Sequence, residues 1–224
     1  VKRLLFLGRS CIYPKFAQQR IQEEALLTGE LEKTNEYYAI AKISGIKLCE
    51  SLRLQYGFDA ISLMPTNLYG EGDNYDLQNS HVMAALIRKF YEAQKYSYKS
   101  ITCWGTGSPL REFLHVDDLG DAVIFALESW DPDKPESPRK KDGQPLYFLN
   151  VGTGQDISIK NLANKISNLV SFKGEILWDK SKPDGTPKKQ LNTKKINSLG
   201  WSPKISLDEG IKKTLKLIEK QNLL

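Results

Sequence analysis

The residues best suited to chemistry in this sequence are a tyrosine and a lysine four positions apart, Tyr38 and Lys42. On a helix, positions i and i+4 lie on one face about a turn apart, so both side chains can point into one cleft. A neighbouring ammonium stabilises the charged form of a phenol, which suits a tyrosine to proton transfer at neutral pH. Such pairs also occur by chance on exposed helices, so a surface tyrosine beside a solvated lysine is the alternative.

This pair needs a helix to hold it, and the apolar pattern predicts one within an α/β fold. Residues 1–7 form an apolar run that is too short for a helix, which predicts a buried parallel strand. We expect a helix over 35–56, capped by Thr34 or Asn35, and a second strand over 58–65. Strand, helix and strand at this spacing form a βαβ unit, and open sheets of this kind bind ligands at the carboxyl ends of their strands.

The helix over 35–56 has apolar residues on more than one face, so we expect it to be buried both against the sheet and against another helix or subunit. These residues are Ile40, Ile43, Ile46, Leu48 and Leu52. Apolar periodicity predicts further helices and strands along the rest of the chain. The helices are expected over 80–96, from 111–119 to about 129, over 158–170 and from a capping box at Ser206 and Glu209; the strands are expected over 101–104, 146–151 and 175–178.

Composition bounds the class of protein without deciding its function. The chain has 224 residues, of which 40% are hydrophobic and 26% charged, as in a soluble globular protein with a full core. The net charge of +5 is spread widely and fits a phosphorylated small molecule as well as nucleic acid. Three scattered cysteines give no metal motif or disulfide framework, and no apolar run reaches the roughly 18 residues of a membrane span. We expect a cytoplasmic protein that binds no metal, nucleic acid or membrane.

Five segments, taken in order, resemble the extended short-chain dehydrogenase/reductase family. They are Ser10-Cys11-Ile12-Tyr13-Pro14, the Tyr-x-x-x-Lys pair on a helix, Pro65-Thr66-Asn67-Leu68-Tyr69-Gly70, Arg111-Glu112-Phe113-Leu114-His115-Val116-Asp117-Asp118, and Asn150-Val151-Gly152-Thr153-Gly154. The resemblance covers essentially the whole chain. It implies an α/β fold made of the C-terminal part of a Rossmann-type doubly wound parallel sheet and a small α/β substrate-binding domain.

Within this family, three segments are similar to members that act on GDP-linked keto-deoxyhexoses. These are Ser-Cys-Ile-Tyr-Pro, Asn-Ser-His-Val and Ser-Lys-Pro-Asp-Gly-Thr-Pro. The similarity implies an oxidoreductase with epimerase activity in nucleotide-sugar biosynthesis. Such an enzyme epimerises C3 and C5 of GDP-4-dehydro-6-deoxy-D-mannose and then reduces C4 with NADPH. The choice of NADPH over NADH rests on the resemblance alone. The resemblance and the doubly apolar helix both predict a homodimer.

The family begins with a βαβ unit whose Gly-rich loop seats the cofactor pyrophosphate on a helix N-terminus. This chain has no such loop, so we expect it to correspond to the C-terminal two thirds of a family member. Residues 1–75 would be the remainder of the NADP-binding Rossmann domain, and 76–224 would mainly form the nucleotide-sugar-binding domain. Segments 101–130 and 146–152 could return in part to the first domain.

The resemblance gives roles to the residues with useful chemistry. Tyr38 would protonate the C4 oxygen as hydride arrives from the nicotinamide, while Lys42 would hold the nicotinamide ribose. Cys11 and His81 match the acid/base pair for epimerisation, because a thiol and an imidazole titrate close enough to neutrality to move protons beside a ketone. The alternatives are a small buried hydrophobe for Cys11 and a hydrogen-bonding residue at a helix start for His81.

The strand-end loop departs from the family at one position. The family places a hydroxyl residue, usually serine, two positions before the cysteine, where it hydrogen-bonds the substrate carbonyl beside the tyrosine. Here that position is Arg9. A guanidinium fits poorly in a pocket built for a small hydroxyl, although it can donate hydrogen bonds to a carbonyl or a pyrophosphate. Ser10 could supply the missing hydroxyl only after a backbone rotation.

The remaining site residues are also carried by the resemblance. Cofactor-binding positions are Leu7, Gly8, Arg9, Ser10, Lys42, Pro65, Thr66, Asn67, Leu68 and His81. Substrate-binding positions are Lys89, Trp104, Arg111 and Asp184. A cation suits the pyrophosphate and an indole can stack on the base, although an exposed lysine such as Lys89 is as often merely solvated. We expect His115 and Asp117 to fix a turn and a helix start.

Two alternatives remain open at this stage. The chain could belong to another nucleotide-sugar epimerase, dehydratase or reductase, although ordinary 4-epimerases lack the Cys11 and His81 pair. It could also be a catalytically inert fragment that retains affinity for a nucleotide sugar, which the arginine at position 9 and the missing Gly-rich loop favour.

Overall fold

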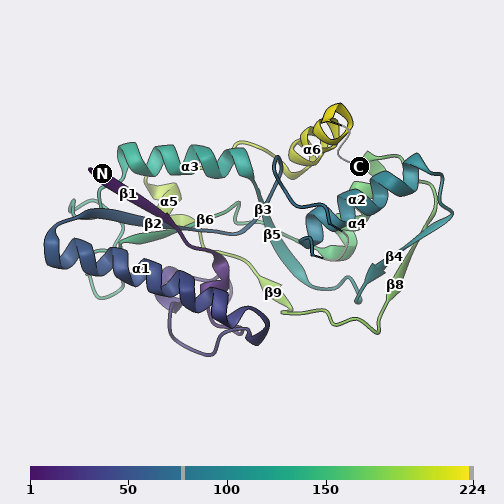
Figure 1. Cartoon of the computed structure of the whole chain (residues 1–224). Helices are drawn as coiled ribbons and strands as arrows, with labels where there is room; N and C mark the ends of the chain where they lie inside the picture. The colour runs from purple at the N-terminus through teal and green to yellow at the C-terminus, as the bar shows by residue number, and fades with distance from the viewer. Residues whose placement is uncertain (77–78, 222–224) are drawn as a thin grey trace.

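Three parallel strands carry one end of the molecule (Figure 1). The computed structural model describes residues 1–76 and 79–221. The strands are β1 (Arg3–Leu7), β2 (Asp59–Pro65) and β6 (Phe148–Val151), paired in the order β1-β2-β6. Nearly every residue of β2 and β6 is buried, as expected for strands covered on both faces. The strands expected over 1–7, 58–65 and 146–151 are confirmed.

Helices cover both faces of this sheet. Figure 1 shows α1 (Glu36–Tyr56) on one face and α3 (Val116–Ser129) on the other. Because a side chain at Gly45 would collide with the Phe6 ring, a Cβ placed there lying 2.3 Å from its Cζ, this glycine lets α1 approach the sheet closely. The helix ends at Gly57, whose φ of 64° is left-handed.

The N-terminus of α1 differs from the prediction, while burial of its second apolar face against a subunit stays a prediction. Asn35 takes the N-cap position, but its side chain makes no capping hydrogen bond. Burial is also one-sided within this chain, because Ile43 and Ile46 are buried while Ile40 and Leu48 are 47% and 59% exposed. The apolar residues of α1 that face away from the sheet are therefore open to solvent here.

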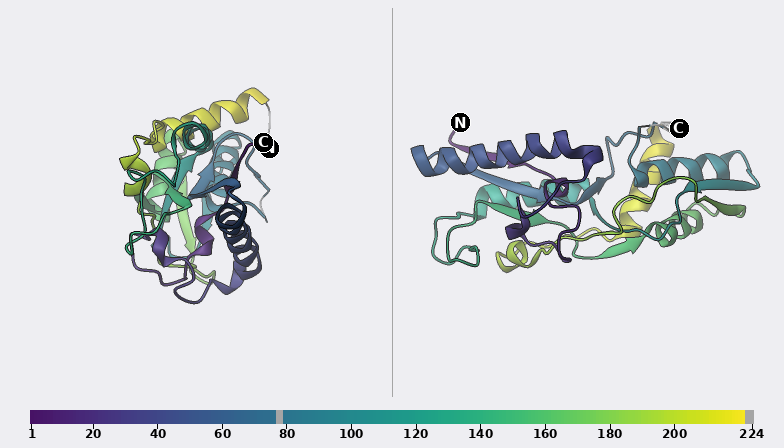
Figure 2. Two further views of the ribbon diagram at one scale, coloured as in Figure 1. Left: turned by 90° about the vertical axis from the view of Figure 1, so that its left-hand side faces the viewer. Right: turned by 90° about the horizontal axis from the view of Figure 1, so that it is seen from below.

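A second packed unit lies at the other end of the molecule, as the right-hand view of Figure 2 shows. It contains α2 (Val82–Lys95), α4 (Ile159–Leu169) and α6 (Leu207–Gln221), with the parallel pair β4 (Ser100–Trp104) and β8 (Glu175–Asp179). Its core is apolar and includes Phe90 and Ile166. The predicted capping box is confirmed, since the Ser206 N and Oγ donate to Glu209 Oε2 and the Glu209 N donates to Ser206 Oγ.

A mixed sheet connects the two ends. It consists of β3 (Asn67–Tyr69), β5 (Leu110–His115), β7 (Asp156–Ser158) and β9 (Lys188–Lys189). The central strand β5 was not expected, because the sequence over 111–119 was interpreted only as the approach to a helix. The expected helix start is confirmed, since the His115 Nδ1 accepts a hydrogen bond from the Asp117 N.

The long segment between β1 and α1 is tied to the sheet by buried hydrogen bonds. It contains the short helices η1 (Ser10–Ile12), η2 (Glu23–Ala25) and η3 (Lys33–Asn35). The Tyr13 hydroxyl donates to Asn150 Oδ1 at 2.6 Å, and the Asn150 N donates to the buried Glu23 carboxylate at 3.0 Å. Because Tyr13 follows η1 directly, these bonds fix η1 at the carboxyl end of β1.

Glu112 on β5 joins three separate segments. It is fully buried, and its two carboxylate oxygens accept hydrogen bonds from the Gly154 N and the Leu191 N, both at 2.8 Å. Its backbone oxygen accepts from Asn67 Nδ2 at 2.9 Å. Burial raises the pKa of Glu112, and its hydrogen bonds with backbone N–H groups oppose that rise.

Replacing Glu112 by alanine is expected to lower the free energy of unfolding by about 3 kcal/mol, because it leaves two buried N–H groups without acceptors. Urea unfolding followed by circular dichroism measures this loss. Glu136→Ala, which removes an exposed carboxylate, is the matched control. A loss for Glu112→Ala no larger than for the control would contradict the bridging role.

The described residues contain no helix that is both long and apolar enough to cross a membrane. In the same part of the chain, no three His, Cys, Asp or Glu side chains gather closely enough to hold a metal ion.

Candidate active site

Two cavities meet at the carboxyl ends of β1 and β2. The larger has a volume of about 880 Å³ and the smaller about 360 Å³. Three side chains line both of them, namely Arg9, Tyr38 and His81. They come from the end of β1, from the first turns of α1 and from the N-cap of α2. The boundary between the cavities is therefore built from the residues to which the sequence assigned proton transfer, together with the unexpected arginine.

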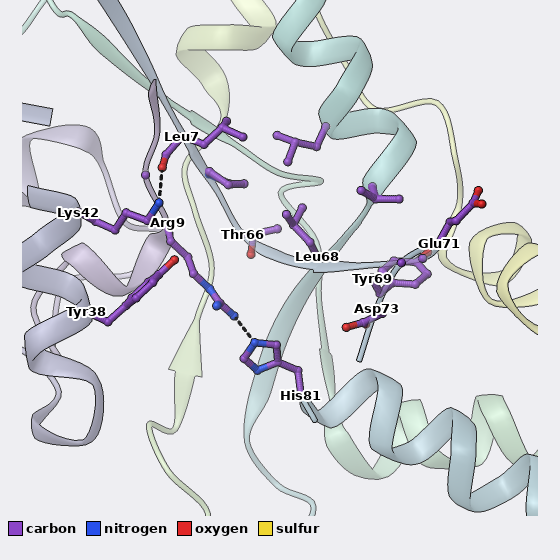
Figure 3. A pocket seen from close by; sticks show the side chains of 16 residues that line it. Leu7, Arg9, Tyr38, Lys42, Thr66, Leu68, Tyr69, Glu71, Asp73 and His81 are labelled. Atoms are coloured by element: carbon purple, nitrogen blue, oxygen red, sulfur yellow. Dashed lines mark hydrogen bonds between the residues drawn. The ribbon is translucent and has the colours of Figure 1, made fainter. Parts of the chain in front are cut away.

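The smaller cavity collects most of the predicted cofactor residues. Those that line it are Leu7, Gly8, Arg9, Lys42, Pro65, Thr66, Leu68 and His81. At Gly8 the backbone passes so close to Met64 that an added Cβ would lie 2.3 Å from its sulfur. The Lys42 Nζ donates to the Leu7 carbonyl at 2.8 Å and lies 5.7 Å from the centre of the Tyr38 ring (Figure 3). Ser10 and Asn67 line the larger cavity instead.

The larger cavity collects the predicted acid/base groups. Tyr38, Cys11, His81 and Ser10 all line it, so the structure brings together four of the five predicted catalytic residues. The fifth, Lys42, borders only the smaller cavity. Cys11 and Ser10 lie on η1 and are 6% and 1% exposed, so little of the thiol faces bulk solvent.

Cations dominate the charge around this thiol. Burial raises the pKa of Cys11, while Lys189, Arg9 and Lys42 act in the opposite direction. Burial also lowers the pKa of Lys189 to about 8, and neighbouring Arg111 and Arg9 add to that effect. A thiol surrounded by ammonium and guanidinium groups can reach the thiolate form more readily than burial alone would allow.

The Arg9 guanidinium contacts the imidazole of His81. In Figure 3 the Arg9 side chain runs between those of Tyr38 and His81, and its Nη2 lies 3.2 Å from His81 Nε2. Because a guanidinium can only donate, the Nε2 must accept, which leaves a neutral ring with its proton on Nδ1. The pKa of His81 is lowered, first by burial and then by Arg9, while Asp73 acts in the opposite direction.

Removing this guanidinium is expected to raise the pKa of His81. Burial and the Arg9 charge both lower this pKa, and Arg9→Ser removes the second of these effects. Asp73 still favours the imidazolium form in the variant. An NMR titration of the imidazole carbon signals measures the shift. The other histidine, His115, is the internal control, because burial, Asp117, Lys213 and Asp118 govern its pKa. An unchanged His81 titration would show that the contact with Arg9 is absent in solution.

The four predicted substrate residues separate into two pairs. Arg111 and Asp184 line the larger cavity together. Asp184 is fixed by Thr106, whose N and Oγ1 each donate to its carboxylate at 2.7 Å. Lys89 and Trp104 lie outside the lining residues of that cavity; the Lys89 Nζ donates to the Thr102 carbonyl and lies 5.5 Å from the Trp104 ring centre.

The sequence missed several residues of the larger cavity. They are Lys15, Glu32, Thr34, Asn35, Pro183, Gly185, Thr186 and Lys189. Of these, Lys189 has the strongest electrostatic effect on Cys11 after burial. It reaches the site because β9 pairs in parallel with β5, with Lys189 opposite Arg111. The basic pair Lys188 and Lys189 was visible in the sequence, but no local pattern predicted this pairing.

Comparison with known proteins shows the family to which this chain belongs. Residues 1–138 match the family model described as the NAD dependent epimerase/dehydratase family. The chain belongs to that family. The match covers β1 to the loop after α3, and therefore includes most of both cavities.

One relative with high sequence identity narrows the group of family members that this chain resembles. A probable GDP-L-fucose synthase 1 of Oryza sativa subsp. japonica is 54% identical over 216 residues, which are 96% of this chain and 62% of the rice protein. This chain thus spans less than two thirds of that relative. The family resemblance inferred from the sequence segments is confirmed, and the members that the chain resembles are named GDP-L-fucose synthase.

Solved structures agree on the fold. A GDP-6-OMe-4-keto-L-xylo-heptose reductase from C. jejuni superposes with a TM-score of 0.88 at 37% identity, covering 99% of this chain and 71% of the reductase. A GDP-L-fucose synthetase from Naegleria fowleri, bound to NADP, gives a TM-score of 0.86 at 25% identity, covering 100% of this chain and 68% of that protein. The predicted Rossmann-type α/β fold class is confirmed.

Proposed function

We propose that this protein acts as a GDP-L-fucose synthase. It would epimerise C3 and C5 of GDP-4-dehydro-6-deoxy-D-mannose and reduce C4 to give GDP-L-fucose. The observation that supports this proposal most directly is the meeting of Tyr38, Cys11 and His81 in one cavity. A phenol, a thiol and an imidazole around one space supply the proton transfers that two epimerisations and one ketone reduction require.

The role proposed for each of these residues follows from the cavity that it lines. Cys11 and His81 would remove a proton from a carbon beside the C4 ketone and return one to it, because both line the larger cavity. Tyr38 borders both cavities and would hold the proton that the C4 oxygen receives on reduction. We propose Arg111 and Lys189 as the cations for the GDP pyrophosphate, since both face the cavity and a paired guanidinium and ammonium suit phosphate oxygens.

The smaller cavity fits the nicotinamide end of a dinucleotide. It lies at the carboxyl ends of parallel strands, and Lys42 lines it together with the backbone segment at Leu7 and Gly8, where it could hold ribose hydroxyls. When bound, NADPH would supply hydride. Our proposal is that Leu7, Gly8, Lys42 and the segment starting at Pro65 orient it, while Tyr38 keeps its hydroxyl at the boundary with the sugar cavity.

We further propose that the protein is a cytoplasmic homodimer, in which a second copy covers the exposed side of α1. Tyr37, Ile40 and Leu48 are 86%, 47% and 59% exposed, and their burial would supply a hydrophobic contact. The division into an NADP-binding part over 1–75 and a sugar-binding part over 76–224 also stays a prediction.

The decisive experiment supplies the full-length gene product with GDP-4-dehydro-6-deoxy-D-mannose and NADPH. We expect GDP-L-fucose among the products by liquid chromatography and mass spectrometry. In parallel, calorimetry measures the binding of GDP-mannose to the 224-residue chain. Binding of GDP-mannose, with neither deuterium uptake from heavy water into GDP-4-dehydro-6-deoxy-D-mannose nor formation of GDP-L-fucose, would favour the inert binding fragment over the enzyme.

A further inference from the structure

The arginine at position 9 occupies the boundary between the two cavities. Its side chain lines both of them and ends on His81, with the Tyr38 side chain on its other side (Figure 3). In the part of the chain that the structure describes, no carboxylate forms an ion pair with this guanidinium; the nearby Asp73 interacts with it only at longer range. A cation without a direct counter-ion, at the place where two ligands would meet, is a strong hydrogen-bond donor toward whatever binds there.

The chemistry of epimerisation needs such a donor at one particular atom. C3 and C5 both neighbour the C4 ketone, so loss of a proton from either carbon moves an electron pair into the ring and places negative charge on the C4 oxygen. A fixed cation at that oxygen stabilises the enolate and lowers the barrier to both epimerisations. Reduction has a different requirement, because C4 must come close to the nicotinamide proposed for the smaller cavity. The Arg9 side chain occupies the space between them.

We propose that Arg9 makes this site an epimerase that largely releases its 4-keto product unreduced, because its guanidinium stabilises the enolate oxygen while it keeps the sugar ring from the smaller cavity. This inference rests on the proposed function and gives it a different main product, the epimerised GDP-4-keto-6-deoxyhexose. Arg9 is thus a catalytic residue for epimerisation and an obstacle to reduction.

Each proposed epimerisation is balanced without an oxidant or reductant. One of the two groups, Cys11 as thiolate or neutral His81, takes the proton from the carbon, and the C–H electron pair forms the C=C bond of the enolate. The enolate charge rests on the C4 oxygen beside Arg9. When the C=O bond reforms, the carbon takes a proton on its opposite face from the other group in its protonated form. Solvent then restores both groups to their starting states.

The neutral state of His81 agrees with this assignment. Its Nε2 lone pair is directed to Arg9 in the free protein, so the ring carries no proton there. When the C4 oxygen takes up the guanidinium hydrogen bonds, Nε2 is released as a base in the same cavity. Arg9 thus keeps His81 neutral, and its charge also acts to lower the pKa of Cys11. One side chain therefore affects both groups that act on the sugar.

The test compares two readouts in the full-length gene product with GDP-4-dehydro-6-deoxy-D-mannose. Deuterium uptake from heavy water, followed by mass spectrometry without NADPH, reports epimerisation alone. Oxidation of NADPH together with reduced sugar reports reduction. Three variants separate charge from bulk: Arg9→Met removes the charge and keeps the bulk, Arg9→Ser removes both, and Arg9→Lys keeps the charge. Arg139→Ser removes an arginine that lines neither cavity and is the matched control.

We expect Arg9→Met to slow deuterium uptake about 100-fold without a gain in reduction. We expect Arg9→Ser to slow uptake at least about tenfold, less than Arg9→Met because a hydroxyl can still donate to the oxygen, and to speed reduction at least about tenfold. Arg9→Lys should stay within about tenfold of the unchanged protein in uptake.

The outcomes separate this inference from the function on which it rests. Equal deuterium uptake by the unchanged protein and Arg9→Met would overturn the role of Arg9 in epimerisation, while the proposed function would stand. Full reduction by the unchanged protein would overturn its role as an obstacle. If none of the folded variants takes up deuterium or forms reduced sugar, the proposed function itself fails. Thermal melting identifies any variant that has not folded, and Arg9→Lys and Arg9→Met then carry the comparison.

Discussion

Exchange of solvent deuterium into C3 and C5 of the 4-keto sugar is expected to fall at least about 1000-fold when Cys11→Ser is combined with His81→Ala. Both side chains line the larger cavity, and the double variant removes both groups that can take a proton from a carbon. A serine hydroxyl at position 11 is a much weaker acid than a thiol, so it cannot replace the thiolate at neutral pH. The loss should therefore exceed that caused by any single donor to the enolate oxygen.

The measurement is mass spectrometry of the sugar recovered from heavy water, with each single variant run beside the pair. If the two groups act on opposite faces of the ring, each single variant should already stop net inversion. Cys103→Ser is the matched control, because Cys103 is also buried with a raised pKa but borders neither cavity. Uptake of deuterium by the double variant at the rate of the control would remove both residues from the mechanism.

Local pattern was enough to predict the frame of this site. The helix α1 was predicted almost to the residue, because residues 35–56 are rich in apolar side chains, contain no proline and are followed by Gly57, which ends the helix. The strands β1 and β2 were predicted as short apolar runs between polar loops. Together these elements place Tyr38 near the carboxyl end of β1. The position of Tyr38 in the site therefore follows from the sequence alone.

The strand β5 shows where local pattern fails. Its residues include Arg111 and Glu112, which look like surface residues in sequence, yet Glu112 is fully buried. Its burial is tolerated because Gly154 and Leu191 donate hydrogen bonds to its carboxylate, and both are distant along the chain. No window of neighbouring residues contains that information, so β5 could not be predicted.

The same limit applies to the substrate side of the site. Lys189 reaches the cavity through a two-residue strand that pairs with β5 some eighty positions earlier in the chain. The resemblance predicted Arg111, Asp184, Lys89 and Trp104 together as substrate-binding residues. Arg111 and Asp184 line the larger cavity, whereas Lys89 and Trp104 lie beside one another outside its lining. Which residues line the cavity together depends on the pairing of segments that are distant in sequence. The chemistry that each side chain can perform is known from its residue type alone.

Reduction at C4 is expected to fall about 1000-fold in Tyr38→Phe, while deuterium uptake at C3 and C5 stays within about twofold. The phenol is the acid placed at the boundary of the two cavities, so its loss removes the proton that the C4 oxygen must receive when hydride arrives. Epimerisation uses Cys11 and His81 instead, which leaves that exchange in place.

The measurement follows NADPH oxidation and reduced sugar in the full-length gene product, both with Arg9 and in the Arg9→Ser background, where reduction should be fastest. Tyr37→Phe is the matched control, because Tyr37 is the neighbouring residue on α1 and is 86% exposed. A reduction rate for Tyr38→Phe equal to that of Tyr37→Phe would assign the proton to another group. A parallel fall in deuterium uptake would instead mean that the phenol acts in both reactions, either because it positions the sugar or because it donates a hydrogen bond to the enolate oxygen.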